Sequence, residues 1–125
     1  MNEFTEMVFI YLLVLHWLGD FCLESTWVHY NKTKDSEALM WHCIGYFTTL
    51  FIGLLICRKF NFFNILIFCG FNFILHYIMD AMTSAVNKIT LPLNYTRVFF
   101  VWFGFDQLFH VFFLFFLAKL LTWKI

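Results

Sequence analysis

The chain alternates between long apolar stretches and shorter polar connections. Four stretches, over about residues 4–23, 39–57, 62–82 and 98–121, are almost continuously apolar. About 20 apolar residues in a helix span the hydrocarbon core of a bilayer. A membrane barrel needs about eight strands or more, which four long blocks do not supply. The pattern therefore predicts an all-α integral membrane four-helix bundle, a single transmembrane domain over residues 1–125 with both termini on the same side.

Composition supports this fold class. Apolar residues make up 62% of the 125 residues and charged residues 13%, and the net charge is 0. Ordinary soluble domains have about 45–50% apolar and about 25% charged residues. These values exclude a disordered chain, a soluble globule and a nucleic-acid-binding module. The basic residues divide equally between the two faces of the bundle, so the positive-inside rule does not fix its orientation.

Ionisable residues inside the predicted spans are the main functional signal, because such groups are costly in hydrocarbon. Three helices each carry a histidine and an aspartate four positions apart, and residues at that spacing share one helix face. A fourth histidine lies near the start of the second span. All seven residues fall in the halves of the spans next to the two longer loops, over 24–38 and 83–97. They are His16, Asp20, His42, His76, Asp80, Asp106 and His110.

Four imidazoles and three carboxylates at one depth are a metal-ligand set. Seven ligands exceed the need of one tetrahedral ion and suit two divalent ions about 3.5–4 Å apart with a bridging aspartate. A mixed nitrogen and oxygen set fits zinc, manganese or iron. The four cysteines form no cluster, which argues against a closed structural zinc site. Two other interpretations remain open: hydrogen-bonded pairs within each helix, and a proton relay.

Other polar residues flank this cluster. Glu24 continues the stripe of His16 and Asp20 and could act as a general base or an outer ligand, or be a solvated carboxylate at a helix end. Asn72 is expected to orient a ligand, and Gln107 to support its neighbour Asp106. Four cations rim the same side and could receive an anionic head group, although cations in loops near lipid are common. They are Lys32, Lys34, Lys88 and Arg97.

Short ordered motifs also suggest a family. They are HWLGDF at 16–21, Trp27, Asn31–Lys32, His42, HYIMD at 76–80 and FDQLFH at 105–110. Together they resemble an uncharacterised membrane family of bacteria and phages, filed as domain of unknown function number 3307. The family implies the same seven positions and no substrate. The family is loosely similar to membrane-bound metal-dependent hydrolases, which also place His and Asp in helices. This similarity is an analogy, and a shared fold does not fix a function. A bacterial source implies the inner (cytoplasmic) membrane.

The leading hypothesis is a membrane-embedded metal-dependent hydrolase, in which metal-activated water attacks a lipid or lipid-linked ester, amide or phosphoester. The main alternative is a metal-ion or proton transporter that uses the same cluster as a transit site. The apolar halves of the spans away from the cluster count against it. A di-iron oxidase typically uses Glu and Glu-x-x-His ligands, and a purely structural protein needs no interior ligands. The expected partners are bilayer lipid and a lipid-linked substrate, without nucleic acid, and the chain is compatible with a homo-oligomer.

Overall fold

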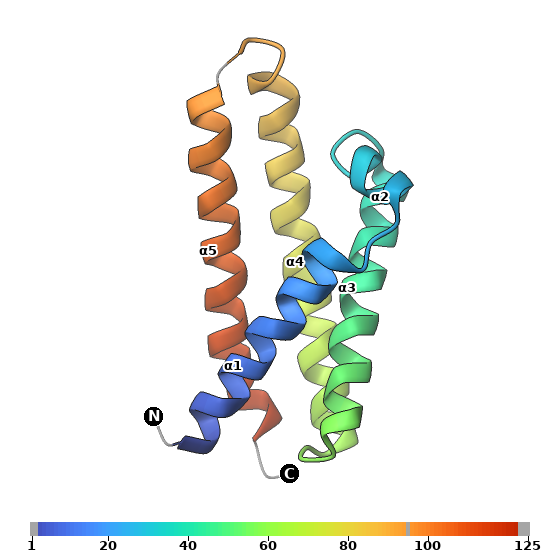
Figure 1. Ribbon diagram of the computed structural model, residues 1–125, viewed down its shortest axis with the longest axis vertical. Helices are drawn as coiled ribbons and strands as arrows, with labels where there is room; N and C mark the ends of the chain where they lie inside the picture. Colours follow the sequence, from blue (N-terminus) through green and yellow to red (C-terminus); the bar gives the residue numbers. More distant parts are fainter. Residues whose placement is uncertain (1–2, 95, 123–125) are drawn as a thin grey trace.

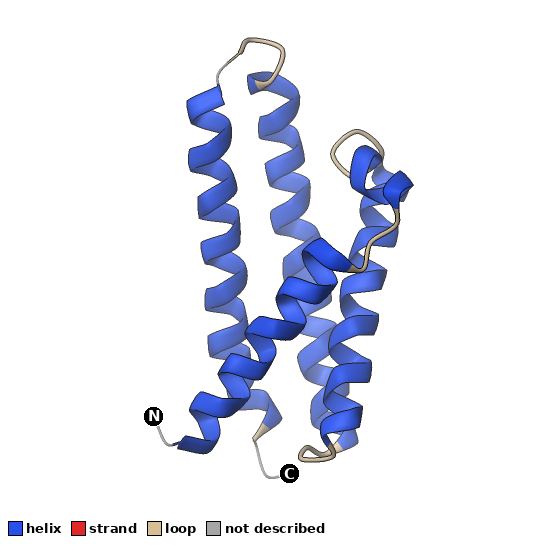
Figure 2. Ribbon diagram, in the orientation of Figure 1, coloured by secondary structure: helices blue, strands red, loops and turns tan. Residues whose placement is uncertain are grey.

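The computed structural model describes residues 3–94 and 96–122, and helices make up nearly all of that part of the chain (Figures 1 and 2). It contains no strand in the described ranges. The predicted all-helical class is therefore confirmed, and four helical segments are long and apolar enough to cross a membrane. The elements are α1 (Glu3–Trp17), the π-helix η1 (Leu18–Cys22), α2 (Thr26–Asn31), α3 (Ser36–Cys57), α4 (Phe62–Thr90) and α5 (Thr96–Leu121).

The long helices α3, α4 and α5 run roughly side by side, and α1 crosses them at a tilt (Figure 1). In Figure 1, α1 begins at the end of the bundle where α5 finishes, as the same-side prediction requires of the described residues. The first helix packs on α3 and α5, while α4 packs on both α3 and α5. The short helix α2 packs on α3, at the opposite end of the bundle from the start of α1.

Polar side chains at the helix starts explain where the elements begin. The carboxylate of Asp35 accepts a hydrogen bond from the Glu37 backbone N–H at 3.0 Å, and Asn61 caps α4 through the Phe63 N–H at 2.8 Å. Such side chains satisfy backbone donors that have no partner within the helix. Ser25 caps α2 in the same way, so the polar segment expected as a loop contains one short helix.

Helix α4 is longer than the apolar pattern predicts. It continues past Met82 to Thr90 because residues 83–90 include neither glycine nor proline, and Pro92 then follows its C-cap, Leu91. Proline cannot continue a helix. The expected loop over 83–97 is consequently reduced to a tight turn. His76 lies at the midpoint of α4, about 21 Å from either helix end, which is deeper along the helix than the sequence pattern suggested.

Two glycines let η1 and α1 lie close to α3. A Cβ on Gly19 would lie 3.1 Å from the Tyr46 ring, and one on Gly53 would lie 2.5 Å from a Leu15 methyl. Small residues at helix contacts are typical of membrane bundles, where packing replaces the hydrophobic effect between helices. The hydrophobic core of the bundle includes Leu12, Leu50 and Leu114, which are fully buried.

Candidate metal centre

Asp20 is presented by an unusual stretch of helix. It lies in the π-helix η1, where the Leu23 N–H bonds to the Leu18 carbonyl five residues back at 2.9 Å. Single π-turns inside α-helices are rare and often occur at functional sites. The turn directs the buried Asp20 carboxylate between α3 and α4, where its Oδ1 atom lies 2.9 Å from His42 Nε2. The four-residue spacing of His16 and Asp20 did not predict this geometry.

Four side-chain atoms from three segments converge at one point. His42 Nε2 lies 3.1 Å from both His76 Nε2 and Asp80 Oδ2. His76 Nε2 lies 3.0 Å from Asp80 Oδ2 and 3.6 Å from Asp20 Oδ1. Three of these four residues are buried and Asp80 is nearly so. Together they form a group that could hold a metal ion.

The spacing of these atoms has the dimensions of a tetrahedral site. Ligand atoms about 2.0–2.2 Å from one zinc-like ion lie about 3.3–3.6 Å apart at the corners of a tetrahedron. The contacts of His42 and His76 with each other and with the two carboxylates fall between 2.9 and 3.6 Å. Two ring nitrogens that face each other at 3.1 Å cannot both carry a hydrogen without a clash, so a lone pair points into the group. Most of these contacts are a few tenths of an ångström shorter than those around a bound ion, so the side chains would have to move apart slightly to hold one.

A second group adjoins the first through Asp80. His110 Nε2 lies 3.5 Å from Asp80 Oδ1, the oxygen that faces away from His42, and His110 Nδ1 lies 3.7 Å from Asp106 Oδ2. His110 Nε2 is buried and has no hydrogen-bond partner among the described residues. His110 Nδ1 donates to the Asp106 backbone carbonyl at 2.7 Å, so Nε2, beside the Asp80 carboxylate, is the nitrogen that a cation could satisfy. Asp80 is thus a member of both groups.

His16 belongs to neither ligand group of the described residues. Its Nδ1 lies 2.9 Å from the Tyr46 hydroxyl, and its Nε2 lies 3.1 Å from Gln107 Oε1. The amide oxygen of Gln107 can only accept, so His16 carries its proton on Nε2 and the Tyr46 hydroxyl donates to Nδ1. Both ring nitrogens are therefore already engaged.

Gln107 links two carboxylates. Its support of Asp106 was expected, but its bond to Asp20 was not. Its amide Nε2 donates to Asp20 Oδ2 at 3.3 Å and to Asp106 Oδ2 at 3.1 Å. Thr83 donates to the other oxygen of Asp106 at 2.9 Å and accepts from the Trp102 indole at 3.1 Å. These bonds fix the carboxylates while leaving Asp20 Oδ1 directed at His42.

Two residues of this network, Tyr46 and Thr83, were missed by the sequence analysis. The Tyr46 ring is 1% exposed and stacks on His76 with centroids 4.1 Å apart. It lies four positions after His42, so the same spacing rule applied to aromatic residues would have found it. Thr83 lies seven positions after His76 on the same helix face. Trp102 of α5 donates the hydrogen bond that Thr83 accepts.

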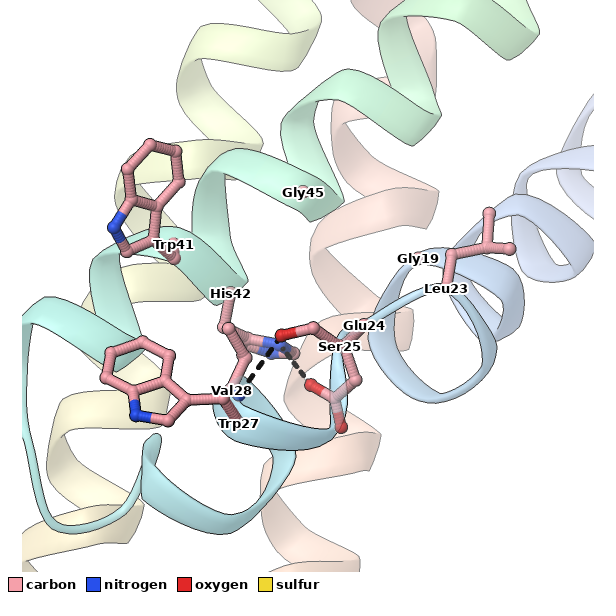
Figure 3. A pocket seen from close by; sticks show the side chains of 9 residues that line it. All are labelled: Gly19, Leu23, Glu24, Ser25, Trp27, Val28, Trp41, His42 and Gly45. Carbon is pink, nitrogen blue, oxygen red and sulfur yellow. Dashed lines mark hydrogen bonds and ion pairs between the residues drawn. The ribbon is translucent and has the colours of Figure 1, made fainter.

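Glu24 lies beside His42 (Figure 3) and pairs with its Nδ1 atom, whereas the ligand group meets its Nε2 atom. Its Oε2 is 2.8 Å from His42 Nδ1, and Lys32 Nζ lies 3.1 Å from both of its oxygens. Burial tends to raise the pKa of Glu24, but the hydrogen bonds from His42 and His29 and the charge of Lys32 outweigh it and hold the pKa at about 2. Glu24 is consequently ionised and fully paired. A carboxylate behind a ligating histidine fixes its tautomer in many metal sites.

The remaining predicted residues lie farther from the ligands. Asn72 is buried and donates to the Phe68 carbonyl of its own helix at 3.0 Å, in the direction away from His76. Three of the predicted rim cations are exposed and do not line the cavity of about 400 Å³ that leads to the ligand groups. They are Lys34, Lys88 and Arg97. Lys32 does line this cavity, although its charge is shared with Glu24.

A cavity of about 400 Å³ leads to the candidate metal centre. The carboxylates Asp20, Asp80 and Asp106 all belong to its lining, so ions bound there would face open space. Phe99 and Phe103 of α5 contribute apolar wall. A second cavity of about 360 Å³ lies on the outer side of His42, next to Trp27 and Trp41 (Figure 3).

One comparison with known proteins identifies a family. A family model described as "Protein of unknown function (DUF3307)" matches residues 8–125. No curated protein and no solved structure matches the chain. The match includes every residue of both ligand groups.

Proposed function

From the premise that the chain belongs to the DUF3307 family, whose description states no function, we propose that it is a membrane-embedded metal-dependent hydrolase. The single observation that supports this most is the geometry of Asp80. One of its oxygens lies about 3 Å from both His42 Nε2 and His76 Nε2, while the other lies 3.5 Å from His110 Nε2, a buried nitrogen with no hydrogen-bond partner among the described residues. Paired metal sites that carry out hydrolysis hold two ions about 3.5–4 Å apart, and a carboxylate with one oxygen towards each ion can bridge that separation.

The donor set fits two divalent transition-metal ions. Asp20, His42, His76 and Asp80 would hold the first ion, and Asp80, Asp106 and His110 would hold the second. Zinc, manganese and iron accept mixed imidazole and carboxylate ligands. When bound, such ions acidify a water molecule and polarise the oxygen of the bond that is attacked. In the hydrolysis, the water oxygen bonds to the carbonyl carbon or phosphorus, the ester, amide or phosphoester bond breaks, and the leaving group takes a proton.

Residues around the ligand groups hold the ligand side chains in position. We assign Glu24 a positioning role, in place of the general base expected from its stripe, because both of its oxygens are paired and it faces His42 Nδ1. Gln107 holds Asp20 and Asp106 in place, and His16 supports Gln107 from behind. A lipid or lipid-linked substrate is favoured because the cavity lies among helices that are long and apolar enough to cross a membrane.

The apolar core supports a hydrolase more than a transporter. On the side of the cluster away from the cavity, the buried residues of the bundle include Leu12, Leu50, Leu54, Phe68 and Leu114. The buried polar groups Asn64 and Asn72 also lie in this part of the bundle, but both donate to backbone carbonyls. An ion that crossed the layer would therefore find few free partners and would face a barrier of several kcal/mol. We therefore expect the centre to be reached from its cavity side and not through the apolar layer.

The test uses purified protein in lipid vesicles, treated with a chelator and reloaded with zinc, manganese or iron. Release of fatty acid or head group from a panel of phospholipids, followed by mass spectrometry, should require metal and should be abolished in Asp80→Asn. Glu37→Gln, which changes an exposed carboxylate at the start of α3, is the matched control and should retain activity. Metal-loaded protein that turns over no ester, amide or phosphoester lipid contradicts the proposal. Saturable ion flux in sealed vesicles that His76→Ala abolishes would favour the transporter.

A further inference from the structure

One wall of the cavity at the metal centre is closed only by side chains. Within the described ranges, η1 has backbone contacts with α1 and α3 but none with α5. The gap between η1 and α5 is bridged by the hydrogen bond from Gln107 to Asp20 and by the rings of Phe21 and Phe103, whose centroids are 6.4 Å apart. Side chains can move aside without disturbing a helix, so this wall is the easiest to open.

The two aromatic residues of this wall face both the cavity and the outside of the bundle. Phe21 and Phe103 line the cavity, yet they are 43% and 40% exposed. On a helix that is long and apolar enough to cross a membrane, an exposed aromatic face meets lipid. The rings of Phe21 and Phe103 thus lie between the cavity and the hydrocarbon at this point.

The charge at the floor of the cavity favours an anion once metal is bound. Asp20, Asp80 and Asp106 supply three negative charges there. Two divalent cations would bring four positive charges, which leaves a net charge of one positive at the floor. Lys32 also lines the cavity, but its charge is paired with Glu24. Phosphate oxygens are good ligands for paired divalent ions. Without metal, the same three carboxylates repel a phosphate.

The size of the cavity separates a head group from its chains. A volume of about 400 Å³ is near the lower end of the range for small-molecule sites. It holds a phosphorylated head group and leaves no space for two acyl chains. The chains must then lie outside the cavity, and the Phe21 and Phe103 wall is where the cavity adjoins lipid.

We propose that the cavity binds the phosphate-bearing head group of a membrane lipid that enters sideways between η1 and α5. The phosphate lies at the metal centre, and the acyl chains leave between Phe21 and Phe103. This inference rests on the proposed metal-dependent function and narrows its substrate class to anionic phospholipids.

Three probes distinguish the contribution of the phosphate from that of the acyl chains, and their binding is compared in metal-loaded protein purified in detergent. Dihexanoyl phosphatidylglycerol has phosphate and chains, dihexanoylglycerol has chains alone, and glycerol 3-phosphate has phosphate alone. Binding is followed by the shift in unfolding temperature during titration. We expect the phosphatidylglycerol to bind at least about tenfold more tightly than either of the others. Removing the metal with a chelator should abolish that preference over dihexanoylglycerol.

Variants of the wall test the route of entry. Phe21→Ala combined with Phe103→Ala should weaken phosphatidylglycerol binding about tenfold and leave glycerol 3-phosphate binding unchanged. Phe100→Ala is the matched control, since Phe100 is an exposed phenylalanine of α5 that does not line the cavity. It should bind all three probes as the unmodified chain does.

Each contrary result has a distinct meaning. Equal binding of glycerol 3-phosphate and the lipid overturns sideways entry, and equal binding of dihexanoylglycerol overturns the phosphate assignment. Double-variant protein that loses affinity for every probe assigns the phenylalanines a structural role. A chain that holds no metal overturns both this inference and the proposed function. Metal-loaded, hydrolytically active protein that fails these binding comparisons overturns this inference alone.

Discussion

The Nε2 atoms of His42 and His76 lie 3.1 Å apart, with carboxylate oxygens of Asp20 and Asp80 beside them. The two histidines come from different helices, α3 and α4, and are 34 positions apart in the sequence. Two imidazole nitrogens that face each other in a buried, acidic setting are stable when they share a proton or a metal ion. The mixed donor set, and the second group built on the same Asp80, favour metal.

The bridging position of Asp80 predicts an unequal loss of metal between two variants. Asp80→Ala removes a ligand from both groups and should reduce bound metal from two ions per chain to none. His110→Ala removes a ligand only from the second group and should leave one ion. Elemental analysis of the purified variants measures both. Equal loss in the two variants would contradict a bridging role for Asp80.

His16 and His42 should differ when each is replaced by phenylalanine. Both were expected as ligands, His16 from its spacing to Asp20 and His42 from its depth, but His16 has both nitrogens engaged by Tyr46 and Gln107. His16→Phe should therefore keep its metal and lose about 1–3 kcal/mol of stability, because Tyr46 and Gln107 lose buried partners. His42→Phe should lose the first ion. Elemental analysis measures the metal content of both variants, and thermal unfolding measures their stability. Loss of metal from His16→Phe would show that His16 is a ligand.

Glu24→Gln tests the positioning role. The amide keeps the shape but cannot hold the Nδ1 proton of His42 as strongly, so metal affinity should fall about 10–100-fold. The metal should still bind at saturating concentration, and activity should then recover. Competition with a chelator of known affinity measures the change. If Glu24 were instead the general base, Glu24→Gln would keep its metal affinity and stay inactive at any metal concentration.

Helix packing gives a prediction independent of metal. A Cβ on Gly53 would lie 2.5 Å from one Leu15 methyl and 2.7 Å from the other, whereas a Cβ on Gly45 of the same helix meets nothing within 4 Å. Gly53→Ala should cost about 1–3 kcal/mol through overpacking. Gly45→Ala is the matched control and should be neutral or stabilising by about 0.5–1 kcal/mol. Thermal unfolding in detergent compares them, and equal effects would show that α1 does not pack on α3 as described.

Much of the fold follows from the sequence because apolar length determines membrane-type helices directly. The end of α4 was less predictable, since the apolar pattern stops at Met82 while the backbone continues helical to Thr90. Local spacing correctly indicated which faces carry His and Asp. It could not indicate which atoms across the bundle meet, because that depends on helix rotation and on the π-turn at Asp20. Spacing therefore grouped His16 with the ligands and gave Gln107 too small a role.

The most direct test of the account is the metal content of the purified, unmodified chain. Protein prepared in detergent without chelators should contain close to two transition-metal ions per chain by elemental analysis, whether zinc, manganese or iron. Dialysis against a strong chelator should remove them and lower the unfolding temperature, since a ligand that binds only the folded state stabilises it. A preparation that contains no stoichiometric metal, and that does not take up zinc, manganese or iron when they are supplied, would contradict the account.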